Sequence, residues 1–454
     1  MVSFWFDQLG GVPEPRPALP GPCEVDVCIV GGGFTGLWTA YELRRADPSL
    51  EVVVLEREFA GFGASGRNGG WVFGALSGAR EQWAERGGRA GAIALERAIQ
   101  ETVDEIGRAV ERERIDCAFV KGGSLVVAQT ERELARVRAH VEADRAWGLG
   151  EHDSALLDGR RLGERVRVQG ALGASFTPHC ARVQPARLVR GLAEAAERAG
   201  ARLYERTPVL ALEPHRARTP FGDVRARWVV RATEGYTAEL PGLGRTVAPI
   251  NSAMIVTEPL GAAAWAELGW ERAETMLDGR HLYAYLQRTP DDRIAIGGRG
   301  IPYRFGSKTD REGPPAERTV SELRGRLRGL FGSAADVPIA GAWHGVLGVT
   351  RDWLPSVGAD PAAGLAWAVG YAGEGVAASN LAARTLRDLL LGERTSLTEL
   401  PWVGPPPRAW EPEPFRYLGI RAVHALYGAA DAAERRTGRR SRFERLANAV
   451  SGRR

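Results

Sequence analysis

Residues 24–36 read EVDVCIVGGGFTG, and this stretch decides the fold of the chain. Its first seven residues are mostly β-branched and apolar, which is typical of a strand buried on both faces. The glycines that follow have G-x-G-x-x-G spacing, and residues 34–45 have the pattern of a helix. A second apolar run, EVVVL at 51–55, completes a strand–helix–strand unit. This order of elements predicts a Rossmann-type dinucleotide-binding fold.

The three glycines and one acidic residue indicate the type of dinucleotide. Gly31 permits a tight turn, Gly33 lets the backbone approach a pyrophosphate, and Gly36 allows the helix to pack closely on the strand. The N-terminus of that helix offers N–H groups and a partial positive charge to the phosphates. Glu56, twenty residues after Gly36, is placed to accept hydrogen bonds from ribose hydroxyls and to repel a 2′-phosphate. FAD or NAD is therefore favoured over NADP.

A second glycine-rich segment distinguishes between these two dinucleotides. After Arg57 the chain reads GFGASGRNGG at 61–70, a loop that contains Ser65, Arg67 and Asn68. A nicotinamide-binding domain does not need this loop. FAD is longer and must pass a second backbone segment, where Arg67 is available to its phosphates. The apolar residues that follow directly disfavour a flexible surface loop, so we expect FAD.

Four motifs together resemble the D-amino-acid oxidase/glycine oxidase superfamily of FAD-dependent oxidoreductases. The likeness extends over about residues 20–405 and is most evident for the γ-glutamylputrescine oxidase-like branch. It implies an α/β fold with a Rossmann-type, discontinuous FAD-binding domain and an α+β substrate domain on a mixed, largely antiparallel sheet. The motifs are CIVGGGFTGLWTAYEL at 28–43, GASGRNGG at 63–70, ATEG at 232–235 and GYAGEGV at 370–376.

The resemblance also implies which residues hold the cofactor. Val209 should meet the adenine through its backbone, and another side of the FAD should be lined by Ala232, Thr233 and Gly235. Residues 370–376 should place a helix N-terminus beneath the flavin pyrimidine, where reduction develops negative charge. The residues expected at the cofactor are Gly31, Gly33, Phe34, Thr35, Gly36, Glu56, Arg57, Gly63, Ala64, Ser65, Arg67, Asn68, Gly69, Gly70, Val209, Ala232, Thr233, Gly235, Gly370, Tyr371, Gly373, Glu374, Gly375 and Val376.

The order of these segments predicts three parts of the chain. The stretch 81–160 has a charged, helical pattern, and 250–300 has alternating strand patterns with a hairpin signal at 290–292. The tail carries a helical apolar stripe and ends in the basic run RRTGRRSRFER at 435–445. We expect an FAD-binding domain at 1–80, 161–249 and 336–405, a substrate domain at 81–160 and 250–335, and a C-terminal helical extension at 406–454.

Departures from the family pattern concern the flavin linkage and the substrate. Relatives with covalent flavin use a cysteine before a T-x-D motif or a histidine in the first loop, and the matching positions here are Gly345 and Arg67. We therefore expect non-covalent FAD, although His344 lies next to the first position. Relatives that oxidise α-amino acids often have an arginine where this chain has Leu347. Without that cation an α-carboxylate loses its main anchor, so we expect an amine or a substrate with a more distant carboxylate.

The expected reaction is oxidation of a carbon–nitrogen bond by hydride transfer to flavin N5. The resulting imine hydrolyses, and O2 takes the electrons from the flavin. His344 and Tyr285 are the candidate catalytic side chains, with core packing as the alternative for each. Arg299 is the candidate for a distal substrate anion and equally for a surface ion pair. A dehydrogenase that passes electrons to a quinone or to a carrier docked on the basic tail is the alternative function, and a non-enzymatic flavoprotein is a third.

Composition excludes several other classes of protein. The chain has 60 basic and 56 acidic residues, a balance too even to indicate nucleic-acid binding. Its histidines and its four cysteines lack metal-ligand spacing, so we expect no metal, and GxSxG and GxxxxGK[ST] motifs are missing from the sequence. We find no signal peptide and no apolar run of ~18 residues. A cytoplasmic enzyme without an integral membrane segment, acting on a small amine with O2, is expected.

Overall fold

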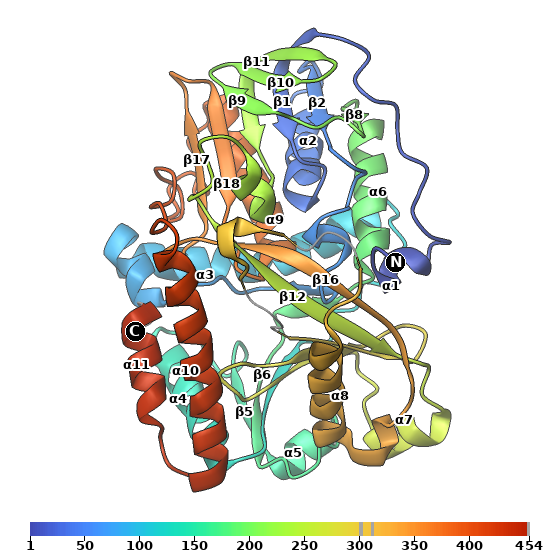
Figure 1. Cartoon of the computed structure of the whole chain (residues 1–454), viewed down its shortest axis with the longest axis vertical. Helices are drawn as coiled ribbons and strands as arrows, with labels where there is room; N and C mark the ends of the chain where they lie inside the picture. The colour runs from blue at the N-terminus through green and yellow to red at the C-terminus, as the bar shows by residue number, and fades with distance from the viewer. Residues whose placement is uncertain (299–302, 310–312, 452–454) are drawn as a thin grey trace.

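We describe the protein from a computed structural model, which places residues 1–298, 303–309 and 313–451. These residues form two eight-stranded sheets at opposite ends of the molecule, the first at the top of Figure 1 and the second at the bottom. Segments from the beginning, middle and end of the sequence meet in the first sheet, and the C-terminal helices lie along the second (Figure 1). Arg299 lies outside the described residues.

The first sheet is a Rossmann-type sheet, as the sequence predicts. The strands from β18 to β8 run parallel to one another, and β17 pairs with β18 in the antiparallel direction at one edge. Strands β9 (Ala211–Glu213) and β10 (Arg216–Thr219) extend β11 as an antiparallel ribbon. The spatial order is β17 (Ser356–Asp360), β18 (Leu365–Val369), β11 (Gly222–Arg231), β1 (Cys23–Val30), β2 (Val52–Leu55) and β8 (Arg202–Tyr204).

Both faces of this sheet are buried, which explains the nearly continuous apolar run of β1. Val27 and Ile29 join a core beneath the helices, whereas Cys28 and Val30 join a core on the opposite face with Leu19. Each face therefore receives every second side chain. On the helical side, α2 packs against both α6 and α9. The helices are α2 (Phe34–Ala46), α6 (Pro185–Arg198), α9 (Gly375–Leu391) and the long α3 (Arg80–Arg112).

The second sheet is mixed and largely antiparallel, also as expected. Among its neighbouring pairs, β13 and β4 run parallel and the others antiparallel. The hairpin expected at residues 290–292 joins β14 to β15. The order is β16 (Ile339–Val349), β12 (Ala248–Thr257), β15 (Ile294–Gly298), β14 (Tyr285–Arg288), β13 (Thr275–Asp278), β4 (Ser124–Ala128), β6 (Gly173–Thr177) and β5 (Ala155–Asp158).

Smaller elements complete the second sheet and the loops around both sheets. Side chains of α5, α7 and α8 form a core against one face of the second sheet. A two-stranded ribbon is formed by β3 and β7. The bounds are α5 (Gly159–Gly163), α7 (Ala262–Leu268), α8 (Glu317–Phe331), α4 (Glu131–Ala146), β3 (Trp71–Phe73), β7 (Cys180–Arg182), and the 3-10 turns η1 (Ala64–Gly66), η2 (Glu234–Glu239), η3 (Phe305–Ser307) and η4 (Gly332–Ala335).

Strand pairing differs from the expected segments at two places. The stretch 81–160, which has a helical pattern, also contains β4 and β5. These strands are short, and each follows a long charged helix (α3 before β4, α4 before β5), so their period-2 signal is weak. In addition, β6 pairs with β4 and β16 pairs with β12, so both belong to the second sheet. Both nevertheless fall in segments expected for the FAD-binding domain. The division into three domains stays a prediction, and these two strands bear on where its boundaries would lie.

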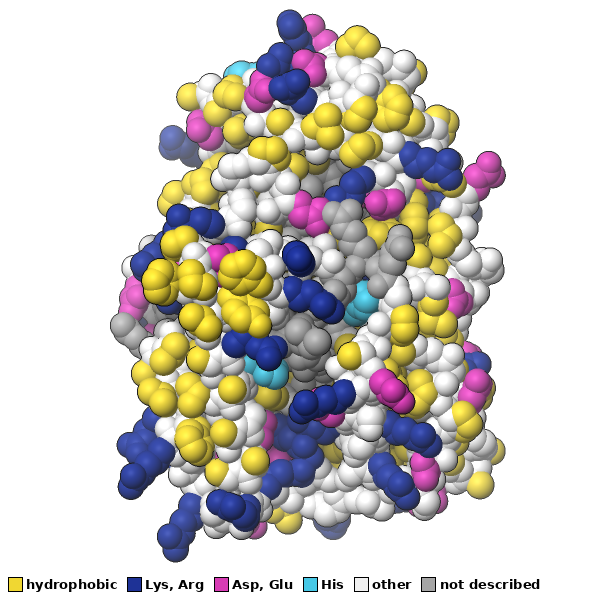
Figure 2. Space-filling view, viewed as in Figure 1, with side chains coloured by type: hydrophobic (Ala, Val, Ile, Leu, Met, Phe, Trp, Pro, Cys, Tyr) yellow, Lys and Arg dark blue, Asp and Glu magenta, His cyan; other side chains and the backbone are white. Residues whose placement is uncertain are grey.

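The two ends of the chain pack on opposite sides of the molecule (Figure 1). The short helix α1 (Phe4–Asp7) buries three consecutive aromatic side chains. At the other end, the C-terminal extension is helical, as expected, and its helices α10 (Phe415–Thr437) and α11 (Arg442–Ser451) form a hairpin. Hydrophobic side chains gather on the outer face of this hairpin (Figure 2). In the described chain, no helix combines the length and hydrophobicity that crossing a bilayer requires. The cytoplasmic location stays a prediction.

Candidate active site

A cavity of about 400 Å³ lies at the carboxyl ends of β1, β2 and β11, where doubly wound sheets bind their ligands. Most residues expected at the cofactor line it: Gly31, Gly33, Phe34, Thr35, Glu56, Arg57, Gly63, Ala64, Ser65, Asn68, Val209, Ala232, Thr233, Gly235, Tyr371, Gly373, Gly375 and Val376. The other six lie outside this lining: Gly36, Arg67, Gly69, Gly70, Gly370 and Glu374. The structure thus brings together five segments that are distant in the sequence.

The first glycine-rich loop is shaped by the absence of side chains. Gly31 has φ +112°, and a Cβ there would lie 2.5 Å from the carbonyl oxygen of Ala232. At Gly36 a Cβ would lie 2.0 Å from the carbonyl oxygen of Gly31, inside the contact distance of the two atoms. The loop, β11 and α2 therefore approach one another as closely as the glycines permit.

Glu56 lies at the end of β2, where the sequence places a ribose-binding carboxylate. Its Oε2 accepts a hydrogen bond from the Gly32 amide at 2.7 Å, and its Oε1 accepts one from the Glu58 amide at 2.9 Å. Burial raises the pKa of this carboxyl, and the two backbone donors act against that rise. The carboxylate is held in one orientation, and its remaining lone pairs are available to ribose hydroxyls.

Two helix N-termini point at the cavity. The first amide of α2, that of Phe34, donates to Oγ of Ser65 at 2.8 Å, so the second glycine-rich loop is fastened to the first. Helix α9 begins at Gly375 without a side-chain cap. Its amides are available to a ligand, and its partial positive charge suits the negative charge of a reduced flavin.

Arg67 holds the second glycine-rich loop to β16. The side chain is 4% exposed, its Nε donates to the Phe62 carbonyl at 2.7 Å, and its Nη1 donates to the His344 carbonyl at 3.2 Å. The Arg67 carbonyl in turn accepts from the Trp343 indole at 2.8 Å. Protein carbonyls thus engage Nε and Nη1 of this guanidinium, and a contact between Arg67 and the phosphates stays a prediction.

The flavin is expected to leave the protein on acid denaturation. Neither the guanidinium of Arg67 nor the missing side chain of Gly345 can form a covalent bond to the flavin, and a Cβ at Gly345 would lie 3.5 Å from that of Arg67. Precipitation with trichloroacetic acid should leave the yellow colour in the supernatant. A yellow pellet would contradict non-covalent binding and point to His344.

Glu234 is a site residue that the sequence analysis missed, although it lies within the ATEG motif. Its Oε2 accepts from the Gly370 amide at 2.9 Å, and its Oε1 accepts from the amides of Gly348 and Tyr371 at 3.1 and 3.2 Å. Burial raises the pKa of Glu234 to about 7, against the effect of these donors and of Arg231. One carboxyl group thus connects η2, β16 and the loop before α9. The sequence feature that could have indicated this role is an acidic residue inside the glycine-containing motif ATEG.

The candidate catalytic side chains lie behind the second glycine-rich loop, outside the lining of the cavity. His344 is 5% exposed on β16, opposite Ala253, and its carbonyl accepts from Arg67. The ring of Tyr285 packs against Trp71, with 6.1 Å between ring centroids, and its hydroxyl lies 3.1 Å from Oγ of Ser252. Packing against neighbouring residues accounts for the positions of both side chains, and a catalytic role for either stays a prediction.

Helix α1 is a further part of the site that the sequence analysis missed. Oγ of Ser3 donates to the Gly66 carbonyl at 2.7 Å, and the Trp5 indole donates to the Asn68 carbonyl at 2.8 Å. Trp5 also packs edge-to-face on Trp343 at 5.8 Å. The N-terminus therefore fixes the second glycine-rich loop from behind. The sequence feature that could have indicated this packing is the run of three aromatic residues at 4–6.

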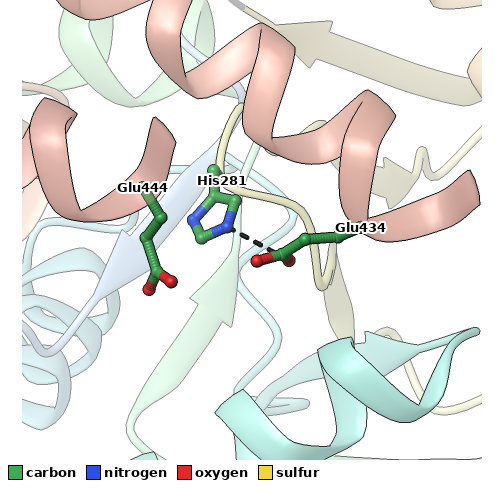
Figure 3. Close-up of side chains that lie close together, drawn as sticks. All are labelled: His281, Glu434 and Glu444. Carbon is green, nitrogen blue, oxygen red and sulfur yellow. Dashed lines mark ion pairs between the residues drawn. The ribbon is translucent and has the colours of Figure 1, made fainter. Parts of the chain in front are cut away.

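One group in the described chain brings three metal-ligand side chains together, those of His281, Glu434 and Glu444 (Figure 3). The His281 ring lies 3.4 Å from Glu434, which also pairs with Arg136 and accepts from the Ser441 amide. Since cations and amides of the chain already engage these carboxylates, we interpret the group as the anchor of the α10–α11 hairpin. The absence of a metal stays a prediction.

The cavity fits FAD in shape and chemistry. Two helix N-termini offer amides to phosphates and flavin, glycines leave room for close backbone approach, and a fixed carboxylate stands where a ribose would lie. The chain belongs to the FAD dependent oxidoreductase family, whose model matches residues 26–389. It is an oxidoreductase with FAD as its cofactor.

Individual relatives agree with this assignment. The chain is 30% identical to the gamma-glutamylputrescine oxidoreductase of Escherichia coli, over 81% of this chain and 84% of the relative. It also resembles the solved structure of glycine oxidase from Geobacillus kaustophilus, with a TM-score of 0.66 and 25% identity over 82% of this chain and 96% of that one. The L-proline dehydrogenase of P. horikoshii shares the fold, with a TM-score of 0.68 and 21% identity over 85% and 98% of the two chains.

Proposed function

We propose that this enzyme oxidises the carbon–nitrogen bond of an amine that lacks a carboxylate on the reacting carbon, with O2 as electron acceptor. The observation that carries the proposal is Leu347, whose side chain lines the cavity near Gly373 and the start of α9. An α-carboxylate at this place would meet an aliphatic side chain where a bidentate cation would be needed. An amine without an α-carboxylate does not need a cation at this position, so Leu347 does not weaken its binding.

Bound FAD supplies the two-electron acceptor. The chain contributes binding, orientation and the exclusion of water. Val346 and Leu347, neighbours on β16, give this end of the cavity an apolar wall. Such a wall disfavours the protonated amine, so that the nitrogen lone pair is free when the carbon is oxidised. The uncapped N-terminus of α9 favours the negative charge that reduction places on the ring.

The names of relatives support an amine substrate. One is a gamma-glutamylputrescine oxidoreductase and others are glycine oxidase and a sarcosine oxidase subunit, so their reactions involve carbon–nitrogen bonds. For this chain the choice among such substrates rests on Leu347.

An anaerobic screen tests the proposal. We expect primary or secondary amines without an α-carboxylate to bleach the flavin absorption, and α-amino acids to do so at least about tenfold more slowly, since a lost charge-assisted hydrogen bond costs about 1.5–3 kcal/mol. The measurement is the rate of bleaching in a stopped-flow instrument. Bleaching by α-amino acids alone would show that Leu347 does not decide the substrate.

A dehydrogenase is the second candidate, because the C-terminal hairpin presents an apolar surface to solvent (Figure 2). Phe443 lies within the basic run, and the exposed residues could contact a carrier protein or quinone pool. Reoxidation of the reduced flavin in air with release of hydrogen peroxide supports the oxidase, and flavin that stays reduced in air supports the dehydrogenase. The surface consists of Phe415, Leu418, Phe443, Leu446 and Val450.

A further inference from the structure

A second cavity, of about 270 Å³, lies between the second sheet and the C-terminal hairpin. Ile250 and Val349 line it from β12 and β16, and Ile420, Val423 and Tyr427 line it from α10. The lining is mainly aliphatic and aromatic, as in pockets that bind the apolar part of a small ligand.

This cavity adjoins the cofactor cavity. Leu347 lines both of them, from the position on β16 opposite Ile250. Ala372 lines the second cavity, and its neighbours Tyr371 and Gly373 line the first. A molecule whose reacting carbon lies beside Leu347 in the cofactor cavity therefore has the second cavity within reach of its other end.

The charged side chains at the second cavity are paired with each other or with neighbours. The guanidinium of Arg351 donates to Glu411 at 2.8 and 2.9 Å, and that of Arg416 donates to Glu413 at 3.2 Å. A charged group entering the cavity would have to compete with these pairs and lose its hydration. The cavity therefore favours an uncharged occupant.

The wall formed by α10 is held in place by specific contacts. Asp431 accepts from the amides of His281 and Leu282 at 2.9 and 3.1 Å, and the Glu434 carboxylate pairs with His281 (Figure 3). The Tyr427 hydroxyl donates to Asn448 of α11 at 2.7 Å. Because the family match ends at residue 389, this wall belongs to the part of the chain that the family model does not describe.

We propose that the second cavity binds an uncharged aliphatic or aromatic arm of the amine substrate, so that the C-terminal hairpin determines specificity. The inference rests on the proposed amine oxidation and adds the chemistry of the far end of the substrate. Amines with long apolar arms are preferred, and amines of equal length that end in a carboxylate are rejected.

The test compares amines on the FAD-loaded enzyme under anaerobic conditions. The ratio of the flavin reduction rate to the apparent Kd should be at least tenfold higher for hexylamine than for 6-aminohexanoate. Gly419→Phe should lower the ratio for hexylamine at least tenfold relative to that for propylamine. Gly419 lines the cavity and a Cβ there meets no atom within 4 Å, so the added ring fills the cavity without a backbone collision.

Ala422→Phe is the matched control, since it adds the same ring to an exposed position of the same helix. A second readout avoids catalysis: saturation-transfer NMR should detect 1-hexanol bound to the wild type and to Ala422→Phe, but not to Gly419→Phe. If amines bleach the flavin while Gly419→Phe leaves both the preference and hexanol binding unchanged, the pocket assignment is overturned and the proposed function stands. If no amine bleaches the flavin, the proposed function itself fails, and the pocket assignment with it.

Discussion

Replacing Gly36 with alanine is expected to weaken FAD binding by up to about 150-fold, because overpacking of this kind costs about 1–3 kcal/mol. The new Cβ would lie 2.0 Å from the carbonyl oxygen of Gly31, and a backbone atom cannot move away as a side chain can. Helix α2 must then shift away from the loop that approaches the pyrophosphate. The flavin content of the purified protein and a fluorescence titration with FAD measure the effect.

Gly21→Ala is the control, since a Cβ there meets nothing within 4 Å. Circular dichroism and the unfolding temperature distinguish loss of flavin from loss of the fold. A folded Gly36→Ala protein that retains stoichiometric FAD with wild-type affinity would contradict the expected contact between this loop and the cofactor.

Glu234→Gln is expected to remove a pH dependence of stability. Burial raises the pKa of Glu234 from 4.5 to about 7 in the folded protein. The contribution to stability is therefore fully present below pH 4.5, and it is lost as the pH rises through 7. A shift of this size corresponds to about 3 kcal/mol. The wild type should lose stability between pH 5 and 8 relative to the variant, measured by chemical unfolding with and without added FAD.

The variant also tests the connection between η2, β16 and the loop before α9. A glutamine retains one acceptor oxygen, so at least one of the amides of Gly348, Gly370 and Tyr371 loses its partner at a cost of about 1–3 kcal/mol. Glu239→Gln, on the exposed side of the same 3-10 turn, is the control. Parallel pH profiles of the wild type and Glu234→Gln would contradict a raised pKa at this residue.

The sequence predicts those parts of the site that depend on local spacing. The unit from β1 to Glu56 follows from strand, glycine, helix and acid positions within about thirty residues, and the structure has the same elements. The late segment at 370–376 was available only through its resemblance to a family. Both parts place most of their expected cofactor residues around the cavity.

The missed residues act through contacts between distant segments. Trp5 supports residues 61–70, and Glu234 connects backbone amides of two other segments. Arg67 is a residue type that often binds phosphate, but its Nε and Nη1 donate to the carbonyls of Phe62 and His344, and tertiary packing brings the second of these near. Single-sequence patterns report burial and period, and they contain no information on which distant backbone groups meet.

The fastening of the second glycine-rich loop has a consequence for the order of events during synthesis. This loop leaves the ribosome soon after α1, whereas its other support at Trp343 and the helix start at Gly375 leave it much later. The nascent chain therefore lacks a complete flavin pocket until the start of α9 has been synthesised. Cofactor capture must follow that step, and chains that terminate before β16 would be released colourless.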